Sequence, residues 1–168
     1  MKTLTLFRHA KSDWGNNDIK DFDRPLNERG QKEAPIMGKV LHNKEHSPDL
    51  IISSSALRAF TTAQLVAKEL DYPETNIQVI NELYNAPAGM MLRIIQRTDD
   101  SVNHLFVFGH NPGISDLACQ YIGERSVGLR TSEAVTITFN VDSWKSCQIR
   151  TGKLLHYFAN PSNADYKI

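Results

Sequence analysis

Histidine residues directly follow two short apolar segments of the sequence. Arg8 and His9 come after residues 3–7, and His110 comes one glycine after residues 105–108. A neutral imidazole can attack phosphorus and form a covalent phosphorylated intermediate. Arginine presents a planar fork of N–H donors that matches the oxygens of a phosphate group. These residue types predict phosphoryl-transfer chemistry in which arginine supplies the positive charge and no metal is required.

A third apolar segment brings a second arginine. Residues 50–52 end in the three serines of residues 53–55, and Arg58 falls in the first turn of the helix expected after them. In open α/β sheets, ligands bind beyond the carboxyl ends of the strands. If the three segments are neighbouring parallel strands, two histidines and two arginines meet at one edge of the sheet. The sequence contains no G-x-x-x-x-G-K-[ST] motif, so it does not support nucleotide hydrolysis by a P-loop.

The spacing of apolar residues predicts the first helix. Asn27 is a suitable N-cap, and the inner face carries apolar side chains close to helical spacing, at Ala34, Met37 and Leu41. Pro35 removes a backbone hydrogen bond inside this segment, which predicts a kink or a break nearby.

Further elements alternate along the chain. A second helix is indicated by apolar residues at helical spacing, namely Ala59, Ala63, Val66 and Leu70. A short strand over residues 77–80 and a helix over residues 90–96 are expected next. Asn111 as N-cap and Pro112 as first helical residue then predict a helix that ends near residue 121.

The last third of the chain has the pattern of paired strands. Apolar and polar residues alternate over residues 135–141 and again over residues 155–157, with a connection over residues 142–151. Strands that alternate with helices and then give way to two adjacent strands predict an α/β fold. We expect a three-layer α/β/α sandwich with a mostly parallel central sheet, formed by a single domain over residues 1–168.

Composition narrows the classes of partner. Lys plus Arg and Asp plus Glu number 19 each in 168 residues, so the formal net charge is zero. Nucleic-acid and membrane-surface binding both favour a basic excess. The sequence has no membrane-span or signal-peptide pattern, and its two cysteines, Cys119 and Cys147, form no CxxC motif. We therefore expect a monomer in the cytoplasm with no cofactor, no metal, no nucleic-acid partner and no membrane partner.

Four blocks of the sequence resemble the motifs of the histidine phosphatase superfamily, in the order of that family. They are LFRHAKS at residues 6–12, DRPLNERG at residues 23–30, SSSALRAFTTA at residues 53–63 and VFGHNPG at residues 107–113. Ala-Lys after Arg-His is typical of the small SixA-like phosphohistidine phosphatase branch. The resemblance implies a phosphoglycerate mutase-like fold. No long insertion follows the first or third strand, so no sizeable cap over the pocket is expected.

The resemblance also implies roles for the residues of these motifs. His9 matches the nucleophile that becomes phosphorylated, and Arg8, Arg58 and His110 match the phosphate pocket around it. The implied activity is a metal-independent phosphatase with a histidine nucleophile. Its implied substrate is a phosphohistidine on a phosphorylated protein.

Two further assignments from the resemblance have structural alternatives. Arg24 is placed near the phosphate, but it could instead form a salt bridge with Asp21 or Asp23. Glu82 is the acidic proton donor expected after the third strand, but it could instead be an N-cap or a loop carboxylate.

The function has alternatives as well. A small phosphorylated metabolite would be an ester substrate and would require a strong proton donor. A phosphate-binding module without turnover is a second alternative, which the intact His9 argues against. A zinc site made of His9, His110 and a cysteine lacks the usual ligand spacing.

Overall fold

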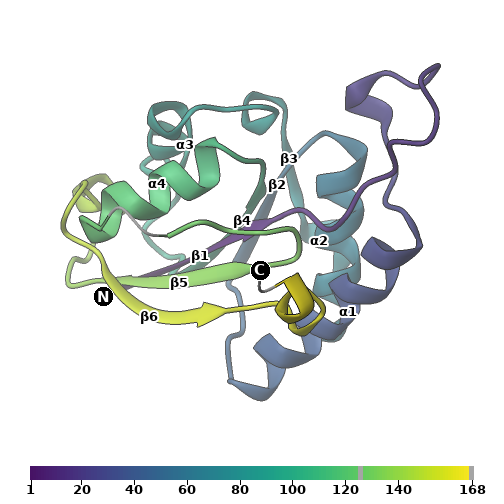
Figure 1. Ribbon diagram of the computed structural model, residues 1–168. Helices are drawn as coiled ribbons and strands as arrows, with labels where there is room; N and C mark the ends of the chain where they lie inside the picture. Colours follow the sequence, from purple (N-terminus) through teal and green to yellow (C-terminus); the bar gives the residue numbers. More distant parts are fainter. Residues whose placement is uncertain (125–126, 167–168) are drawn as a thin grey trace.

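Six strands form one sheet through the centre of the molecule (Figure 1). The computed structural model describes residues 1–124 and 127–166. The strands are β1 (Lys2–Arg8), β2 (Leu50–Ser54), β3 (Gln78–Ile80), β4 (His104–Gly109), β5 (Ala134–Phe139) and β6 (Lys153–Phe158). Their order across the sheet is β3-β2-β4-β1-β5-β6. The first four pair in parallel, and β5 and β6 extend the sheet in antiparallel fashion.

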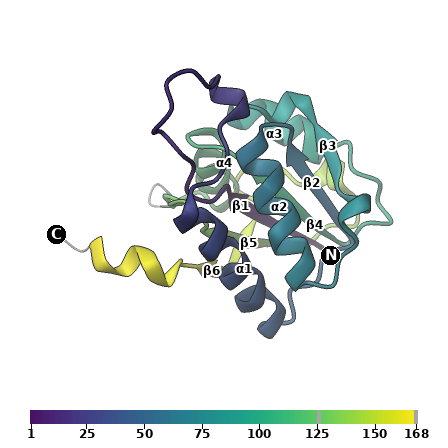
Figure 2. The ribbon, with the colours of Figure 1, turned by 90° about the vertical axis from the view of Figure 1, so that its right-hand side faces the viewer.

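Four α-helices cover the two faces of this sheet. They are α1 (Glu28–Asn43), α2 (Leu57–Glu69), α3 (Ala88–Ile95) and α4 (Gly113–Ile122). Helices α1 and α2 pack together on one face, nearest the viewer in Figure 2, and α3 and α4 pack on the other. The predicted α/β sandwich with a mostly parallel sheet is confirmed. In the described residues, no helix is long and apolar enough to cross a membrane.

Short 3₁₀ helices shape the connections between these elements. They are η1 (Asp21–Asp23), η2 (Glu74–Asn76), η3 (Asn81–Leu83), η4 (Trp144–Ser146) and η5 (Pro161–Tyr166). Of these, η1 and η3 follow the carboxyl ends of β1 and β3 and carry residues that matter below.

The central strands are apolar along their length because helices cover both of their faces. In β1, Leu4 and Leu6 belong to the core under α3 and α4, whereas Phe7 belongs to the core under α1 and α2. The ring of Phe7 stacks on that of Phe108 in β4, with 4.8 Å between centroids. This packing fixes the register in which Arg8 pairs with Gly109. Strands β1 and β4 therefore end side by side.

Helix α1 is uninterrupted, so of the kink or break expected near Pro35, the break does not occur. The helix spans Glu28–Asn43, and Asn27 caps it as predicted by accepting a hydrogen bond from the Gly30 N–H at 2.9 Å. The predicted inner face is fully buried, at Ala34, Met37 and Leu41. Proline costs one helical hydrogen bond, and burial of this apolar stripe outweighs that cost.

Helix α4 starts one residue later than predicted, and Asn111 does not cap it. Pro112 takes the N-cap position before Gly113, without a side-chain hydrogen bond. The Asn111 side chain instead donates to the carbonyl oxygen of Leu129 at 2.8 Å and accepts from the Ser115 hydroxyl at 2.6 Å. These bonds tie the start of α4 to the loop that precedes β5.

Gly30 allows α1 to start directly against the segment that follows β1. A Cβ atom at Gly30 would lie 2.1 Å from the carbonyl oxygen of Lys11, two residues after His9. At Gly89 in α3, a Cβ atom would meet nothing within 4 Å beyond its own helix and chain neighbours. We predict that Gly30→Ala lowers the free energy of unfolding by at least about 2 kcal/mol, because backbone must shift to make room.

Gly89→Ala is the matched control and should leave stability unchanged or raise it by up to ~1 kcal/mol, because alanine favours helix. Urea denaturation of both variants measures the difference. Equal stability of Gly30→Ala and the unmodified protein would contradict the close approach of α1 to this segment.

Candidate active site

Three neighbouring parallel strands deliver the predicted residues to one edge of the sheet. His9 follows β1 and His110 follows β4, and the backbone N–H of His9 donates to the carbonyl oxygen of Gly109 at 3.1 Å. Arg58 lies in the first turn of α2, just after β2. The condition set from the sequence, that these strands are parallel neighbours, is met.

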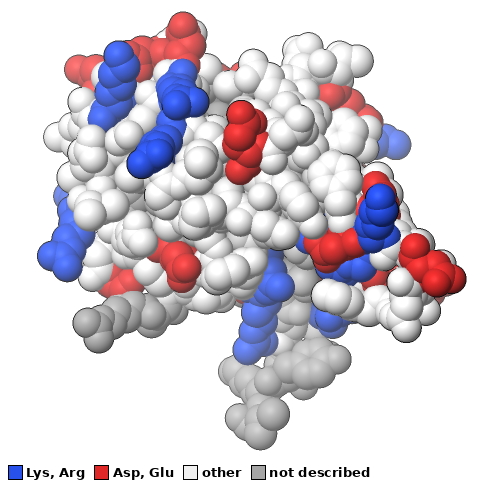
Figure 3. Space-filling view, turned by 90° about the horizontal axis from the view of Figure 1, so that it is seen from above, with Lys and Arg blue, Asp and Glu red and all other residues white. Residues whose placement is uncertain are grey.

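A cavity of about 370 Å³ opens at this edge of the sheet, and we call it the His9 pocket. It is lined by Arg8, His9, Lys11, Ser12, Trp14, Asp21, Arg24, Arg58, Asn85, His110, Asn111 and Thr131. Seen from above, acidic and basic side chains stand next to one another at the right-hand side of the molecule, where the connection between β1 and α1 projects (Figure 3).

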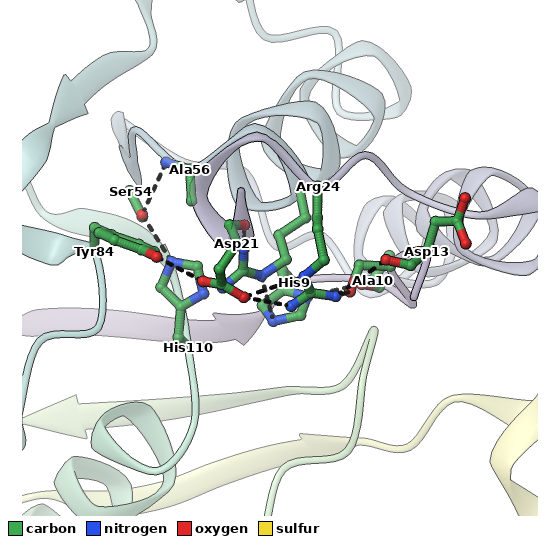
Figure 4. A network of polar contacts seen from close by, with 11 residues as sticks. His9, Ala10, Asp13, Asp21, Arg24, Ser54, Ala56, Tyr84 and His110 are labelled. Atoms are coloured by element: carbon green, nitrogen blue, oxygen red, sulfur yellow. Dashed lines mark hydrogen bonds and ion pairs between the residues drawn. The ribbon is translucent and has the colours of Figure 1, made fainter. Parts of the chain in front are cut away.

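The hydrogen bonds of His9 define its tautomer. Its Nδ1 lies 2.8 Å from the carbonyl oxygen of Ala10, which can only accept, so Nδ1 carries the proton (Figure 4). The lone pair is then on Nε2, which accepts from the Nε–H of Arg58 at 3.4 Å. His9 therefore presents its nucleophilic nitrogen toward an arginine.

Both histidines of the pocket are held in the neutral form. Burial lowers the pKa of His9 to about 3, and the positive charges of Arg58 and Arg8 contribute to the shift. Burial also lowers the pKa of His110 to about 4, with Arg58 again contributing. Their ring centroids lie 5.1 Å apart, and the two residues are only 7% and 3% exposed. A neutral His9 is the form that can attack phosphorus.

Two buried nitrogen atoms of the pocket have no hydrogen-bond partner among the described residues. They are Nε of Arg8 and Nδ1 of His110. The other ring nitrogen of His110 is bonded to the Ser54 hydroxyl at 2.7 Å. A buried donor without a partner costs free energy, and an oxygen of a bound anion would relieve that cost.

Asp21 joins two arginines of the pocket. Its Oδ1 accepts from Arg24 at 2.9 and 3.1 Å, and its Oδ2 accepts from Arg58 at 3.2 Å and from the Tyr84 hydroxyl at 2.6 Å. The Tyr84 hydrogen bond and the two guanidinium groups lower the pKa of Asp21 to about 2. The carboxylate is therefore ionised at neutral pH and lies where two arginine side chains converge (Figure 4).

The sequence left two roles open for Arg24, a place near the phosphate and a salt bridge with Asp21 or Asp23. The structure shows Arg24 both in the pocket and in a salt bridge. It is 7% exposed and lines the His9 pocket, and it also forms a salt bridge with Asp21. Its guanidinium donates to the Ser12 hydroxyl and stacks on the ring of Trp14, 3.6 Å from the ring centroid. These contacts hold Arg24 in a fixed orientation toward the pocket.

Glu82 does not line the His9 pocket. It lies on η3 after the edge strand β3, is exposed, and lines a separate cavity together with Met90 and Arg97. Strand β3 is separated from β1 by two other strands, so its carboxyl end reaches the pocket only at its margin. Tyr84, two residues after Glu82, makes the contact instead, with its ring 5.7 Å from that of His110.

Several residues that line the His9 pocket or contact its residues were not identified from the sequence as functional. Asp21 was considered only as a salt-bridge partner of Arg24. Tyr84 lies two residues after Glu82, and only Glu82 was considered as a site residue there. No sequence signal distinguished the remaining pocket residues Trp14, Asn85 and Thr131 from ordinary loop residues.

In the described residues, neither cysteine lies where it could complete a zinc site with His9 and His110. Cys147 is buried in the core under α3 and α4, and the Cys119 thiol contacts the carbonyl oxygen of Val127. Among the described residues, no group of three or more histidine, cysteine or carboxylate side chains is arranged to hold a metal ion.

Curated proteins similar to this chain come from a plant, from yeast and from bacteria. An uncharacterized chloroplastic protein of Arabidopsis thaliana is 28% identical over 159 residues, which is 90% of this chain and 72% of that protein. An uncharacterized protein of Mycobacterium tuberculosis is 38% identical over 111 residues, which is 66% of each chain. This chain thus aligns with about two thirds to three quarters of the length of these two relatives.

Solved structures share the fold over nearly the whole chain. A protein assigned as the phosphohistidine phosphatase SixA of Agrobacterium tumefaciens is 29% identical, with a TM-score of 0.81 over 94% of this chain and 97% of that one. The protein histidine phosphatase SixA in complex with tungstate has the same TM-score and coverage at 22% identity. A mycobacterial glucosyl-3-phosphoglycerate phosphatase shares the fold at 15% identity, with a TM-score of 0.66 over 95% of this chain and 100% of that one.

The chain also matches a protein-family model, in agreement with its motifs and with the geometry around His9. The family model described as histidine phosphatase superfamily (branch 1) matches residues 4–109, which include the ends of β1, β2 and β4. The chain belongs to the histidine phosphatase superfamily.

Proposed function

We propose that this protein is a phosphatase that removes the phosphoryl group from phosphohistidine on a protein, with His9 as the nucleophile. The observation that carries the proposal is the buried, neutral imidazole of His9, whose Nε2 lone pair is directed at the arginine-lined pocket. Similarity to the Agrobacterium tumefaciens protein assigned as a phosphohistidine phosphatase supports the choice of substrate.

The reaction has two steps at Nε2 of His9. In the first, Nε2 attacks phosphorus, the new N–P bond forms, and the bond from phosphorus to the substrate imidazole breaks. The leaving imidazole takes a proton from solvent water as it departs. In the second step, water attacks the phosphorus of phosphohistidine-9, the N–P bond breaks, and inorganic phosphate leaves with His9 neutral again.

Arg8, Arg58 and His110 stabilise the transferred group in this proposal. Two arginine forks place positive charge beside the equatorial oxygens, where charge is concentrated during transfer. The partnerless Nε of Arg8 and Nδ1 of His110 are suited to donate to these oxygens. His110 donates through Nδ1 if the Ser54 hydroxyl donates to its Nε2, and their 2.7 Å contact allows this arrangement.

The acid–base character of the pocket favours a substrate with a good leaving group. An alkoxide leaving from a phosphate ester needs a strong proton donor. The carboxyl group in the pocket, Asp21, has a pKa of about 2 and is ionised at neutral pH, and Glu82 lines a different cavity. Imidazole is a much better leaving group than an alkoxide, so the lack of a protonated carboxyl is less costly for phosphohistidine.

We predict that a phosphohistidine peptide is hydrolysed with a higher kcat/KM than common phosphomonoesters, including sugar phosphates and nucleotides. Glu82→Gln should lower the rate with the phosphohistidine peptide by less than about tenfold, because it removes no group from the His9 pocket. A steady-state assay over this panel of substrates checks both expectations. A preference for an ester, or a loss of about a thousandfold in Glu82→Gln, would favour a small-molecule phosphatase instead.

The low pKa of His9 predicts an unusual pH profile. Free histidine has a pKa of about 6.5, and a nucleophile with that value would lose activity as the pH falls through it. Since the pKa of His9 in the folded protein is about 3, His9 stays neutral at mildly acidic pH. We expect kcat/KM, corrected for ionisation of the substrate, to remain level from about pH 8 down to about pH 5. An acidic limb near pH 6.5 would show that His9 titrates as an ordinary histidine.

A further inference from the structure

A second cavity adjoins the His9 pocket, with a volume of about 390 Å³. It is lined by Arg8, Lys11, Arg29, Arg130, Thr131 and Asn163, and we call it the Arg130 cavity. Arg8, Lys11 and Thr131 line both cavities, so the two are contiguous. Four of the six lining residues are basic and none is acidic.

Backbone hydrogen bonds fix the Arg130 cavity relative to His9. The loop before β5 carries Arg130, and its next residues bond to the segment that holds the nucleophile. The Ser132 N–H donates to the carbonyl oxygen of His9 at 3.2 Å, and the Arg8 N–H donates to that of Glu133 at 3.0 Å. A substrate group in this cavity therefore lies at a defined position from the reacting nitrogen.

The positive charge of this cavity is only partly neutralised. Arg29 forms a salt bridge with Glu33, so its charge is balanced locally. The guanidinium groups of Arg8 and Arg130 donate to neutral carbonyl oxygens, those of Leu129 and Asn163 respectively, at 3.1 and 2.9 Å. These contacts orient the two side chains without neutralising them, and the Glu133 carboxylate offsets part of the charge of Arg8 through space.

The Glu133 carboxylate lies close enough to act on the charge of Arg8, but its hydrogen bonds are made to other groups. Glu133 is buried and accepts from the Tyr157 hydroxyl at 2.6 Å, from the Asn163 side chain at 3.1 Å and from the backbone N–H of Arg130 at 2.9 Å. It does not line the Arg130 cavity but lines a neighbouring one, which Arg130 and Asn163 also line. Its contacts hold the loop of Arg130 and the start of η5 in place.

We infer that the Arg130 cavity is a second anion-binding subsite, which takes a carboxylate of an aspartate or glutamate side chain that lies beside the phosphohistidine of the substrate protein. The inference rests on the proposed function and adds a specificity determinant to it. Arginine forks and an ammonium group recognise carboxylate and phosphate oxygens alike. A second phosphate on a small metabolite is thus the other source of the same chemistry, and the experiment separates the two.

The test compares four substrates. Two are phosphohistidine peptides that differ only in having glutamates or glutamines beside the phosphohistidine. The others are phosphoramidate, which has no second anionic group, and a small bisphosphorylated metabolite. Each is assayed with the unmodified protein, with Arg130→Gln and with Arg93→Gln. Arg93 is an exposed arginine on α3 outside both cavities, so it controls for the loss of one surface charge.

We expect the unmodified protein to prefer the glutamate peptide to the glutamine peptide. Arg130→Gln should raise KM for the glutamate peptide by about tenfold with little change in kcat, and it should change phosphoramidate and glutamine-peptide hydrolysis by less than about twofold. Arg93→Gln should change none of these values.

Three results would overturn the inference. The first is equal hydrolysis of the two peptides by the unmodified protein, and the second is an equal effect of Arg130→Gln on all substrates. The third is an effect of Arg130→Gln on the bisphosphorylated metabolite alone, which would assign the cavity to small molecules. If the unmodified protein hydrolyses none of the phosphoramidate and peptide substrates, the proposed function itself fails, and the subsite fails with it.

Discussion

The hydrogen bond from Nδ1–H of His9 to the carbonyl oxygen of Ala10, at 2.8 Å, is the contact on which the site depends. It holds the ring in one tautomer and directs the Nε2 lone pair toward Arg58. Burial keeps the imidazole neutral, since a charged ring would have to lose its hydration beside two arginines. Positive charge at this site therefore comes from arginine, which stays protonated, and nucleophilicity comes from histidine, which stays neutral.

Two of the pocket arginines, Arg24 and Arg58, form salt bridges with Asp21. Its carboxylate is bonded to Arg24 and Arg58 and to the hydroxyl of Tyr84. The Arg8 guanidinium has no such carboxylate contact, and its Nε has no hydrogen-bond partner among the described residues. Asp21 lies on η1 within the connection between β1 and α1, which is the part of the molecule that projects at the top of Figure 2. Asp21 therefore links this connection to two arginines of the His9 pocket.

The sequence was most informative about elements that a single local pattern is enough to locate. Buried parallel strands require continuous apolar segments, so β1, β2 and β4 and the residues at their ends could be located, and with them Arg8, His9, Arg58 and His110. A break at Pro35 and the capping role of Asn111 were wrong because tertiary contacts overrode local propensity. These contacts are the buried stripe of α1 and the bonds of Asn111 to Leu129 and Ser115. Glu82 was selected because the resemblance places an acidic proton donor after the third strand, and the sequence did not show that two other strands separate β3 from β1. The same holds for the Arg130 cavity, which forms only when β5 pairs with β1.

The central claim is that His9 accepts the phosphoryl group, and isolation of the phosphorylated protein tests it most directly. The protein is mixed with an equimolar radiolabelled phosphohistidine peptide, denatured in alkali within milliseconds to seconds, and digested for peptide mapping. The account predicts acid-labile, alkali-stable label on the peptide that contains His9, which appears before inorganic phosphate and is missing in His9→Ala. Release of phosphate without labelled protein at any time, or label on a residue other than His9, would contradict it.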